Sequence, residues 1–587
     1  MDEQQRRLAE ELIFSGEKKS SFAKKLYFGL LDSDQLFPYP KENSAEKNKV
    51  DEFLSKVDNF IQKEIDPAAI DRIASIPDHV IKGLGELGVL GMTIPKEYGG
   101  LGMSQYAYCR VVEAISRRCG STALFVNAHQ SIGLKALLLF GTEAQRKRWL
   151  PNLARGEALA AFSLTEPNAG SDASGVETRA VFIPEKNVYR INGKKQWTTN
   201  GSIAQVLTVM AQTEVETPQG KQDKITAFLV NPDMPGFTIT AHALDKVGMR
   251  GSKTANLEFK NLEVPAENIL GPLGGGLKVC LTVLDFGRTT FGAACTGAAK
   301  ALVEKATLHA VNRWQFKRPL ASFGLVKKKI ATMSALAYAM DATTYMTAGL
   351  VDSKADDFML EAAMLKVFTS DSLWSILYDA MQILGGRSFF TDEPYERMMR
   401  DARLNMIGEG SNEVMRAFIG VVGMRDVGMQ LKNVMEALQN PFLKHEVLLQ
   451  FIRQRWNCLK SPKIPVHSSL LTSETDKLGK AIRQFGNAIL RLLGKHRENI
   501  LEKQLLLDRI ASSAMAIYTC ASVLSKLDSD LAEARGNSAA LGNDVPIAKL
   551  YCQMAFDCID TNLGSLFSNH DQTFEVVSDQ ITGVKFP

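Results

Sequence analysis

Glu409 is the residue whose setting most suggests chemistry. It lies between Gly408 and Gly410 and is followed by Ser411 and Asn412. Because glycine has no Cβ atom, the flanking positions let the backbone bring this carboxylate close to a flat ligand, with its own N–H accessible. A base that removes a proton from a weakly acidic C–H needs such an approach. A solvated turn can have the same three residues, so the interpretation depends on other motifs.

Four further segments could bind a polar or phosphate-containing ligand. Phe162 to Asp172 combines hydroxyl side chains with a glycine turn, although a loop joining a helix to a strand can look the same. Trp197 to Gly201 offers an aromatic face beside two threonines. Gln382 to Gly386 ends in paired glycines, where a diphosphate can come close. Asn312 to Phe316 contains Arg313, whose planar guanidinium suits phosphate. Each segment alone is weak evidence.

The period of the apolar residues predicts the elements that hold these segments. It is helical from 49 to about 160, changes to two from 160 to 270, and is helical again to about 431. Within the β region, the pair Asn192-Gly193 predicts a hairpin turn inside 188–197. The later helical segments predict a four-helix bundle and are 277–312, 323–351, 356–384 and 411–431.

The chain of 587 residues is too long for one compact core. The predicted fold is mainly α with a central antiparallel β domain. The predicted domains are an N-terminal extension (1–48), an N-terminal helical domain (49–160), a β-barrel domain (161–275), a C-terminal four-helix bundle (276–431) and a helical extension (432–587).

Composition weighs against several other classes of protein. The net charge is +4 with both signs mixed, which does not predict a nucleic-acid partner. Eight cysteines show no CxxC pair and no metal-like spacing, so we expect reduced thiols and no metal. No run approaches the ~18 apolar residues of a membrane span. The acidic N-terminus predicts a bacterial cytoplasm, with a peripheral place at the inner membrane, or the mitochondrial matrix or inner membrane if a presequence has been removed.

In this order and at these separations, the motifs closely resemble the acyl-CoA dehydrogenase family over about residues 20–431. Phe162 to Asp172 is similar to the family's Thr-Glu-Pro-x-x-Gly-Ser-Asp loop, and Trp197 to Gly201 to its Trp-x-Thr/Ser-Asn-Gly. Gln382 to Gly386 and Glu409 to Glu413 stand where the family has its glycine pair and catalytic glutamate.

Further motifs indicate which subgroup of the family the sequence resembles. Ser21 to Lys24, Ala128 to Gly133 and the long stretch after the bundle resemble the very-long-chain members and their complex-I-assembly relative. That subgroup is typically a homodimer loosely attached to membrane, which implies a peripheral membrane contact through the C-terminal extension.

The resemblance implies FAD, bound non-covalently between the β domain and the second helical bundle. The residues implied to line its flavin are Phe162, Leu164, Thr165, Gly170, Ser171, Trp197, Thr198 and Thr199, with Ser411, Asn412 and Glu413 at the rim. Those implied to hold the adenosine diphosphate half on the neighbouring subunit are Arg313, Phe316, Gln382, Ile383, Leu384, Gly385 and Gly386.

By the same resemblance Glu409 is the base that removes the α proton of an acyl-CoA thioester. The residues implied to meet the substrate are Ser171, Asp285, Arg288, Gly408 and Gly410. Asp285 and Arg288 would contact coenzyme A, although an (i, i+3) surface pair has the same spacing. Gly408 departs from the family, since many members have an aromatic residue there. Leu124 and Ala128 would line the acyl pocket.

The implied function is α,β-dehydrogenation of long- to very-long-chain acyl-CoA thioesters to trans-2-enoyl-CoA in fatty acid β-oxidation. The implied electron acceptor is an electron-transferring flavoprotein. An acyl-CoA oxidase, and a scaffold or assembly protein on the same fold, are the alternatives. In the extension, apolar residues recur at steps of three and four from 476 to 495, which indicates either a core-facing helix with a basic outer face or a surface that meets acidic lipid.

Overall fold

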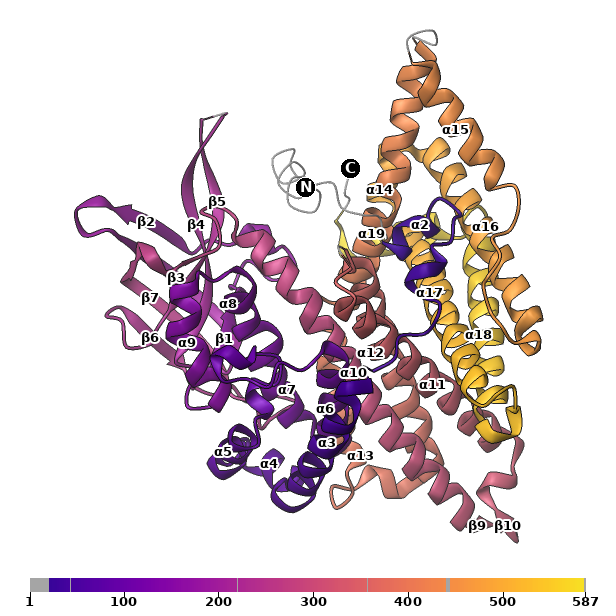
Figure 1. Cartoon of the computed structure of the whole chain (residues 1–587), viewed down its shortest axis with the longest axis horizontal. Helices are drawn as coiled ribbons and strands as arrows, with labels where there is room; N and C mark the ends of the chain where they lie inside the picture. The colour runs from indigo at the N-terminus through magenta and orange to yellow at the C-terminus, as the bar shows by residue number, and fades with distance from the viewer. Residues whose placement is uncertain (1–20, 43, 219, 356, 440–443, 585–587) are drawn as a thin grey trace.

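The computed structural model describes residues 21–42, 44–218, 220–355, 357–439 and 444–584. Figure 1 shows the β domain at one side of the molecule, the helical bundle in the middle and the C-terminal helices at the other side. The predicted fold class, helical with a central β domain, is confirmed.

The N-terminal helices form the wall that faces the β domain. They are α3 (Ser44–Glu64), α4 (Pro67–Ile73), α5 (Asp78–Glu86), α6 (Gln105–Arg118), α7 (Gly120–Asn127), α8 (Leu134–Phe140) and α9 (Glu143–Arg155). Between α7 and α8 the chain passes through one π-helical stretch, Ala128–Gly133, which we call the π turn. Such π turns are rare and occur often at functional sites. The helix α9 begins with a capping box in which the side chains of Thr142 and Gln145 each bond the other residue's backbone N–H.

The β domain is one sheet. Its strands are β1 (Ala160–Ser163), β2 (Arg179–Ile183), β3 (Val188–Thr199), β4 (Val206–Thr217), β5 (Gly220–Val230), β6 (Phe237–Ala241), β7 (Thr254–Pro265) and β8 (Ile269–Leu270). Their order is β6-β7-β3-β2-β4-β5-β8, with β1 paired to β4. The sheet differs from the predicted antiparallel one because β4 pairs in parallel with both β1 and β2.

The predicted hairpin at Asn192-Gly193 is wrong. Both residues lie inside the continuous strand β3, at a register shift against β7 between Ile191 and Gly193. A Cβ atom at Gly193 would lie 2.7 Å from the Cα of Thr178, so this glycine permits a close backbone approach rather than a turn. A glycine within a strand often marks such a bulge.

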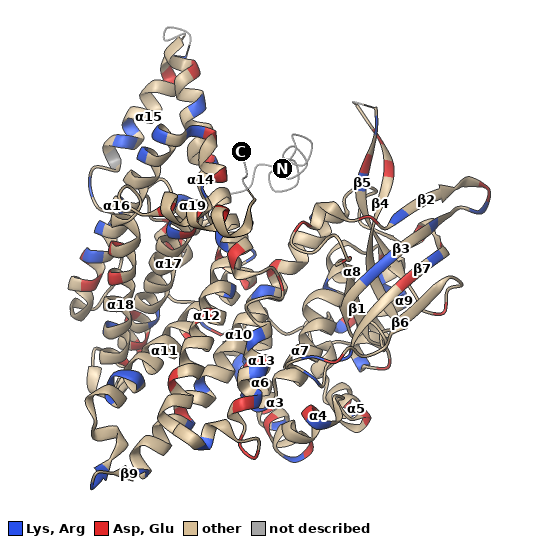
Figure 2. Cartoon of the chain, turned by 180° about the vertical axis from the view of Figure 1, so that it is seen from behind, with Lys and Arg blue, Asp and Glu red and all other residues tan. Residues whose placement is uncertain are grey.

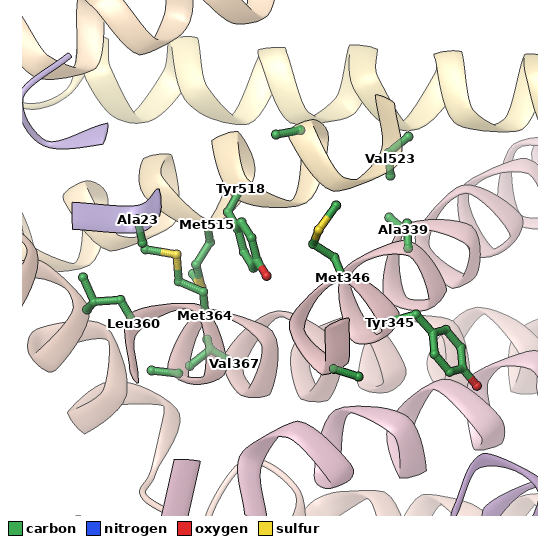
Figure 3. Packing of buried hydrophobic residues seen from close by; sticks show 14 of the residues in the cluster. Ala23, Ala339, Tyr345, Met346, Leu360, Met364, Val367, Met515, Tyr518 and Val523 are labelled. Carbon is green, nitrogen blue, oxygen red and sulfur yellow. The ribbon is translucent and has the colours of Figure 1, made fainter. Parts of the chain in front are cut away.

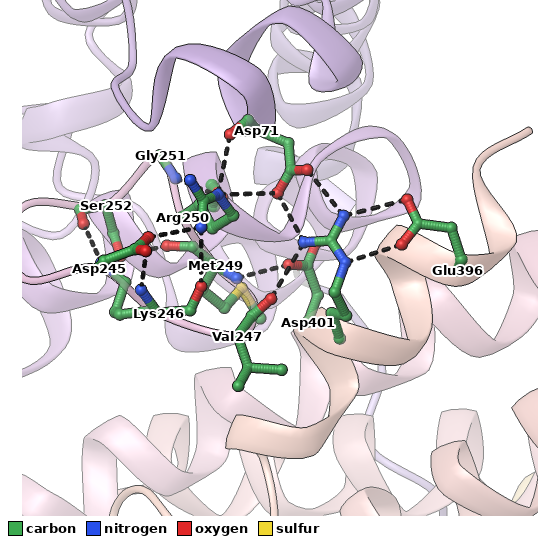
Figure 4. Close-up of polar contacts among 12 residues, drawn as sticks. Asp71, Asp245, Lys246, Val247, Met249, Arg250, Gly251, Ser252, Glu396 and Asp401 are labelled. Carbon is green, nitrogen blue, oxygen red and sulfur yellow. Dashed lines mark hydrogen bonds and ion pairs between the residues drawn. The ribbon is translucent and has the colours of Figure 1, made fainter. Parts of the chain in front are cut away.

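The C-terminal bundle consists of α10 (Gly276–Asn312), α11 (Gly324–Asp352), α12 (Met359–Leu384) and α14 (Asn412–Gln439), close to the predicted ranges. Two short strands, β9 (Trp314–Gln315) and β10 (Arg318–Pro319), follow α10. A helix that was not predicted, α13 (Tyr395–Leu404), lies between α12 and α14. Its Arg400 forms a two-bond pair with Asp71 of α4, at 2.7 and 2.9 Å, and also contacts Glu396 (Figure 4).

The C-terminal extension consists of α15 (His445–Asn457), α16 (Thr472–His496), α17 (Gln504–Glu533), α18 (Asp544–Gly564) and α19 (Asp571–Thr582). Figure 3 shows Met515 and Tyr518 of α17 beside Met364 of α12 in one buried cluster. The early helix α2 (Phe22–Leu26) belongs to the same cluster. Its Ala23 N–H donates to Glu361 Oε1 at 2.8 Å.

The apolar stripe at 476–495 is the core-facing side of α16. The stripe residues are each at most 1% exposed and are Leu478, Ile482, Phe485, Ile489 and Leu492. The reading in which this stripe meets lipid is therefore wrong, because its apolar atoms already contact other helices. Figure 2 shows both signs of charge spread over the outer faces of the helices.

Two helical stretches are long and apolar enough to cross a membrane by composition alone. They are Gly120–Phe140 and Gln504–Glu533, and their apolar windows are 72% and 89% buried inside the fold. Such burial is what the core helices of a large domain show, so the length and composition of these two helices are weak evidence for a membrane span.

Candidate active site

The loop that carries Glu409 connects α13 to α14. Glu409 has φ of 61° and Gly410 has φ of 94°, so both adopt left-handed backbone. This conformation is uncommon for a residue with a side chain. The Glu409 N–H makes no hydrogen bond to any residue that the structure describes. A strained residue with a free donor in a loop between two helices is a candidate functional group.

The Glu409 carboxylate lies against α10 and the π turn. A Cβ atom built on Gly287 would be 3.3 Å from Glu409 Oε2 and 2.9 Å from Ile132 Cγ2. Glu409 Oε2 is buried and has no hydrogen-bond partner among the described residues. A buried acceptor without a partner is costly, and such a cost is retained where a ligand or a reaction uses the group.

Two cations hold the backbone of this loop. Arg288 Nε donates to the Glu409 carbonyl at 3.3 Å. Lys366 Nζ donates to the Gly410 carbonyl at 2.6 Å and to Asn412 Oδ1 at 2.7 Å. Successive carbonyls are therefore fixed by side chains of α10 and α12. Sequence reasoning missed Lys366, because a single lysine in an apolar helix gives no signal of what it contacts.

The pKa of Glu409 is raised by burial, while Arg288 and Lys366 lower it by their charge; the net direction is upward. Burial likewise lowers the pKa of Lys366, to about 8. A carboxylate whose pKa is moved towards neutrality is suited to accept a proton from carbon and to release it later.

The predicted substrate pair is buried rather than on the surface. Arg288 Nη1 donates to Asp285 Oδ1 at 2.9 Å, and the Arg288 side chain is 5% exposed. The (i, i+3) pair therefore exists, but it supports the base-bearing loop from inside. Gly408 has only ordinary contacts around the position of a Cβ atom, so packing does not require glycine there.

The two predicted segments of the β domain are brought together. Gln196 N–H donates to the Thr165 carbonyl at 2.9 Å, which places the loop after β1 beside Trp197. Trp197 has φ of 59° and is 62% exposed, so an aromatic face is presented outward. Thr198 instead bonds Ser163 inside the domain, at 2.9 Å between hydroxyl oxygens, and Phe162 is also buried.

A buried ion pair that the sequence prediction did not include fixes this loop. Lys195 Nζ lies 2.6 Å from Glu166 Oε1, and both side chains are at most 2% exposed. Glu166 also accepts from the Thr178 N–H at 3.1 Å. Burial lowers the pKa of Lys195 to about 8 although Glu166 acts in the opposite direction. The motif contains Glu166, but its partner is 29 residues away, so only the fold reveals the pair.

The β1 end and the base are connected through the π turn. Ala160 N–H donates to His129 Nδ1 at 3.0 Å, and the hydroxyl oxygens of Ser131 and Thr290 lie 2.8 Å apart. The π turn thus joins the start of β1 to α10 next to Gly287. These contacts connect the β domain to the helix that lies against Glu409.

The other predicted cofactor residues divide into two groups. At the rim, the amide of Asn412 is engaged by Lys366, Ser370 and Asp371, so its side chain serves the protein, while Glu413 is exposed. The second group lies at the opposite end of the bundle, by β9 and β10, with Phe316 88% exposed (Figure 1). It also contains Arg313, Gln382, Ile383, Leu384, Gly385 and Gly386, and a Cβ atom at either glycine would meet nothing within 4 Å.

A cavity of about 660 Å³ lies between α7, α10 and α13. Leu124 lines it, whereas Ala128 does not. Phe291 and Asn405 are among its inner lining residues. Phe291 is four residues after Gly287, and Asn405 is four residues before Glu409. Its volume is typical of a small-molecule site.

The residues present fit a flat, polar-edged cofactor. Trp197 offers an exposed aromatic face, Gly170 leaves open space, and Leu164 and Thr165 are only half-buried. An exposed aromatic ring, a free Glu409 N–H and a buried carboxylate fit one class of protein: a flavin-type oxidoreductase that acts at carbon.

Comparison with known proteins identifies the family. Its models match as the acyl-CoA dehydrogenase N-terminal domain over 47–157, the middle domain over 161–262 and the C-terminal domain over 274–423. The ACAD9/ACADV C-terminal domain matches 469–584.

Individual relatives agree with these matches. The chain is 37% identical to the human mitochondrial very long-chain specific acyl-CoA dehydrogenase, over 88% of this chain and 80% of that protein. An acyl-CoA dehydrogenase complexed with FAD from Bacillus anthracis superposes with a TM-score of 0.79 at 28% identity, over 97% of this chain and 96% of that one. A structure described as an electron transferring flavoprotein of Acidaminococcus fermentans has a TM-score of 0.60 at 33% identity, over 65% of this chain and 98% of that one.

The chain therefore belongs to the acyl-CoA dehydrogenase family. It is an FAD-dependent enzyme that dehydrogenates fatty acyl-CoA thioesters, and the predicted family, enzyme class and cofactor are confirmed.

Proposed function

We propose that Glu409 is the base of an α,β-dehydrogenation of long- to very-long-chain acyl-CoA. The observation that carries this is the Glu409 carboxylate: buried, with Oε2 unpartnered and its pKa raised, beside Gly287 on α10. Glu409 takes the α proton, and a C=C bond forms as the β hydrogen leaves with its electron pair. Bound FAD supplies the acceptor for that hydride.

The Glu409 N–H is a donor for the thioester oxygen as negative charge develops there. It has no other partner in the described parts of the chain. A preorganised donor of this kind typically contributes about 3 kcal/mol to the transition state. Arg288 and Lys366 support it, because they fix the carbonyls of the base and of the next residue and so the direction of the N–H.

A long acyl chain is supported by the cavity that begins beside the base. Its inner wall is made of small and apolar residues: Ala123, Leu124, Phe291, Ala294 and Ala298. Each methylene buried there stabilises the bound thioester by ~0.8 kcal/mol. The cavity extends well beyond what a butyryl chain needs.

We also infer a homodimer in which the residues near β9 and β10 hold the cofactor of the partner. Arg313 and Phe316 flank β9, whereas Trp197 belongs to β3, and β3 and β9 lie on different sides of the molecule (Figure 1). A cofactor bound at Trp197 would therefore meet these residues on a second subunit. The exposed Phe316 and Phe389 are the apolar surface that such a contact would cover.

A peripheral membrane contact is proposed for α15 in place of α16. Leu449, Ile452 and Trp456 recur at steps of three and four on one face, and each is at least 55% exposed. Exposed Arg453 lies on the same helix. An apolar face with adjacent basic residues is typical of helices that lie in a lipid interface. The compartment is a bacterial cytoplasm or a mitochondrial matrix, and the eight free cysteines accord with either.

Electrons leave to an electron-transferring flavoprotein in this proposal. Hydrogen peroxide release in air without an added acceptor would instead favour an oxidase. Co-purification of respiratory-chain components with a catalytically silent protein would favour the assembly role.

The test of the base is anaerobic mixing of the purified, yellow protein with palmitoyl-CoA while the flavin band is followed. Glu409→Gln should retain its colour and bind the thioester but lose the bleaching. Glu575→Gln, which changes an exposed carboxylate on α19, is the control and should bleach normally. Bleaching of Glu409→Gln at the wild-type rate would reject the assignment.

A further inference from the structure

We propose that the acyl cavity is open at its far end, so that this enzyme accepts long acyl-CoA thioesters whose distal end carries a polar or ionised group. The substrate class is that of ω-carboxyacyl-CoA thioesters. The inference rests on the proposed function of the Glu409 site and adds to it which chains that site can take.

The cavity follows α10 away from Gly287 and reaches to within one helical turn of it, at Phe291. On α10 its lining residues include Phe291, Ala294, Ala298, Lys305 and Leu308, at the steps of three, four and seven that keep one face of a helix. From Phe291 to Leu308 this face is ~26 Å long at a rise of ~1.5 Å per residue. The first of these residues is one helical turn beyond Gly287, against which the base lies.

The inner part of the cavity has an apolar wall on α7 and α10, with Asn127 and Asn405 also in its lining. Gly120, Ala123 and Leu124 of α7 line the side opposite to α10. Ala123 and Phe291 are at most 6% exposed. This part suits the methylene chain that follows a thioester.

The far part is lined by charged residues that are exposed to solvent. Asp58, Gln62, Glu304 and Lys305 line the cavity and are exposed, and Leu308 is 63% exposed. Between the two parts lies Asp401 of α13, whose Oδ1 accepts the Met249 N–H at 2.5 Å (Figure 4). The lining thus passes from buried and apolar to exposed and charged along one helix face.

An open, charged mouth changes which chains the site can bind. In a closed apolar pocket, an ω-carboxylate would be buried without a partner, which is strongly unfavourable. Here the same group would reach water and the exposed Lys305, which lines the cavity. The distal methyl group of an ordinary acyl chain gains nothing further at the mouth. The site therefore discriminates little between an acyl chain that ends in a methyl group and one that ends in a carboxylate.

The test compares palmitoyl-CoA with hexadecanedioyl-CoA, which has the same length and an ω-carboxylate. With the FAD-loaded enzyme and an artificial electron acceptor, kcat/KM for the two should agree within about tenfold, whereas a closed pocket would separate them by more than about 100-fold. Oxidation of palmitoyl-CoA without oxidation of the dioyl thioester overturns this inference alone. Failure with both substrates rejects the proposed function as well.

Two variants locate the effect. Ala298→Trp fills the cavity midway and should abolish oxidation of both long substrates while butyryl-CoA is still oxidised, which also shows that the variant folds. Lys305→Glu reverses a charge at the mouth and should lower the ratio of dioyl to palmitoyl kcat/KM about fivefold, the size expected for exposed charges. Equal oxidation of palmitoyl-CoA by Ala298→Trp and the wild type would show that the chain lies elsewhere.

Discussion

Lys366→Met should move the acid limb of the profile of kcat/KM against pH to higher pH. Lys366 Nζ bonds the carbonyl next to Glu409, and its charge lowers the pKa of that carboxyl. Arg288 is the other cation that lowers this pKa, so in the variant a single cation opposes the effect of burial. Methionine keeps the length but removes the charge. The carboxylate is then less favoured, so the base needs a higher pH to lose its proton.

The variant also loses two hydrogen bonds to a charged donor, each worth ~1.5–3 kcal/mol. We therefore expect a lower Tm as well, which has to be separated from the effect on the base. Lys300→Met is the matched control, because Lys300 is a half-buried lysine that is also held by an acceptor, 2.7 Å from Glu113, but it does not contact the loop.

The assay is kcat/KM for palmitoyl-CoA against pH, measured below the unfolding temperature of every variant. Lys366→Met should shift the acid limb to higher pH, and Lys300→Met should leave it in place. An unmoved limb in Lys366→Met, or an equal shift in both variants, would refute the electrostatic role of Lys366.

Three further outcomes are expected. Gly287→Val should lower kcat more than 100-fold with flavin retained, because its side chain would occupy the space of the Glu409 carboxylate; near-normal turnover would show that the carboxylate can move aside. Glu166→Gln leaves Lys195 buried without its counter-charge and should lower the free energy of unfolding by ~3–5 kcal/mol. Calorimetry should show a lower Tm, and dialysis should remove bound flavin. Unchanged flavin retention would contradict this role. Arg400→Met breaks a two-bond pair between α13 and α4, so denaturant unfolding should show a loss of ~3 kcal/mol with little change in flavin colour; an unaltered midpoint would show that the pair is dispensable.

The sequence predicts the order of domains and the place of the base because both depend on local patterns. Period changes mark the β region, and Glu409 is set apart by its two glycines. The hairpin at Asn192-Gly193 failed for the opposite reason: the packing of Thr178 against Gly193, a non-local contact, decides that backbone. Local turn chemistry competes with such contacts and loses here, where β3 is paired along both edges, with β2 and β7.

Residues that support the site were not predictable for a similar reason. Lys366 and Glu166 act through partners that lie 44 and 29 residues away in sequence. An apolar stripe, as in α16, shows that one face is covered but not by what. The helix α13 was missed although Tyr395, Met398 and Ala402 recur at steps of three and four, because it is only 10 residues long.

The position of α2 has a consequence for how the polypeptide reaches its native state. Tyr27 donates its hydroxyl proton to the Ile419 carbonyl at 2.8 Å, and its ring packs on Phe485 at 5.1 Å between centroids. The ring of Tyr27 is made early in synthesis. It is covered only after helices nearly 400 or more residues later in the chain have been made. During translation the aromatic side chains of α2 and Tyr27 are exposed. Truncation of the C-terminal helices should therefore yield an aggregation-prone, chaperone-dependent product rather than a smaller enzyme.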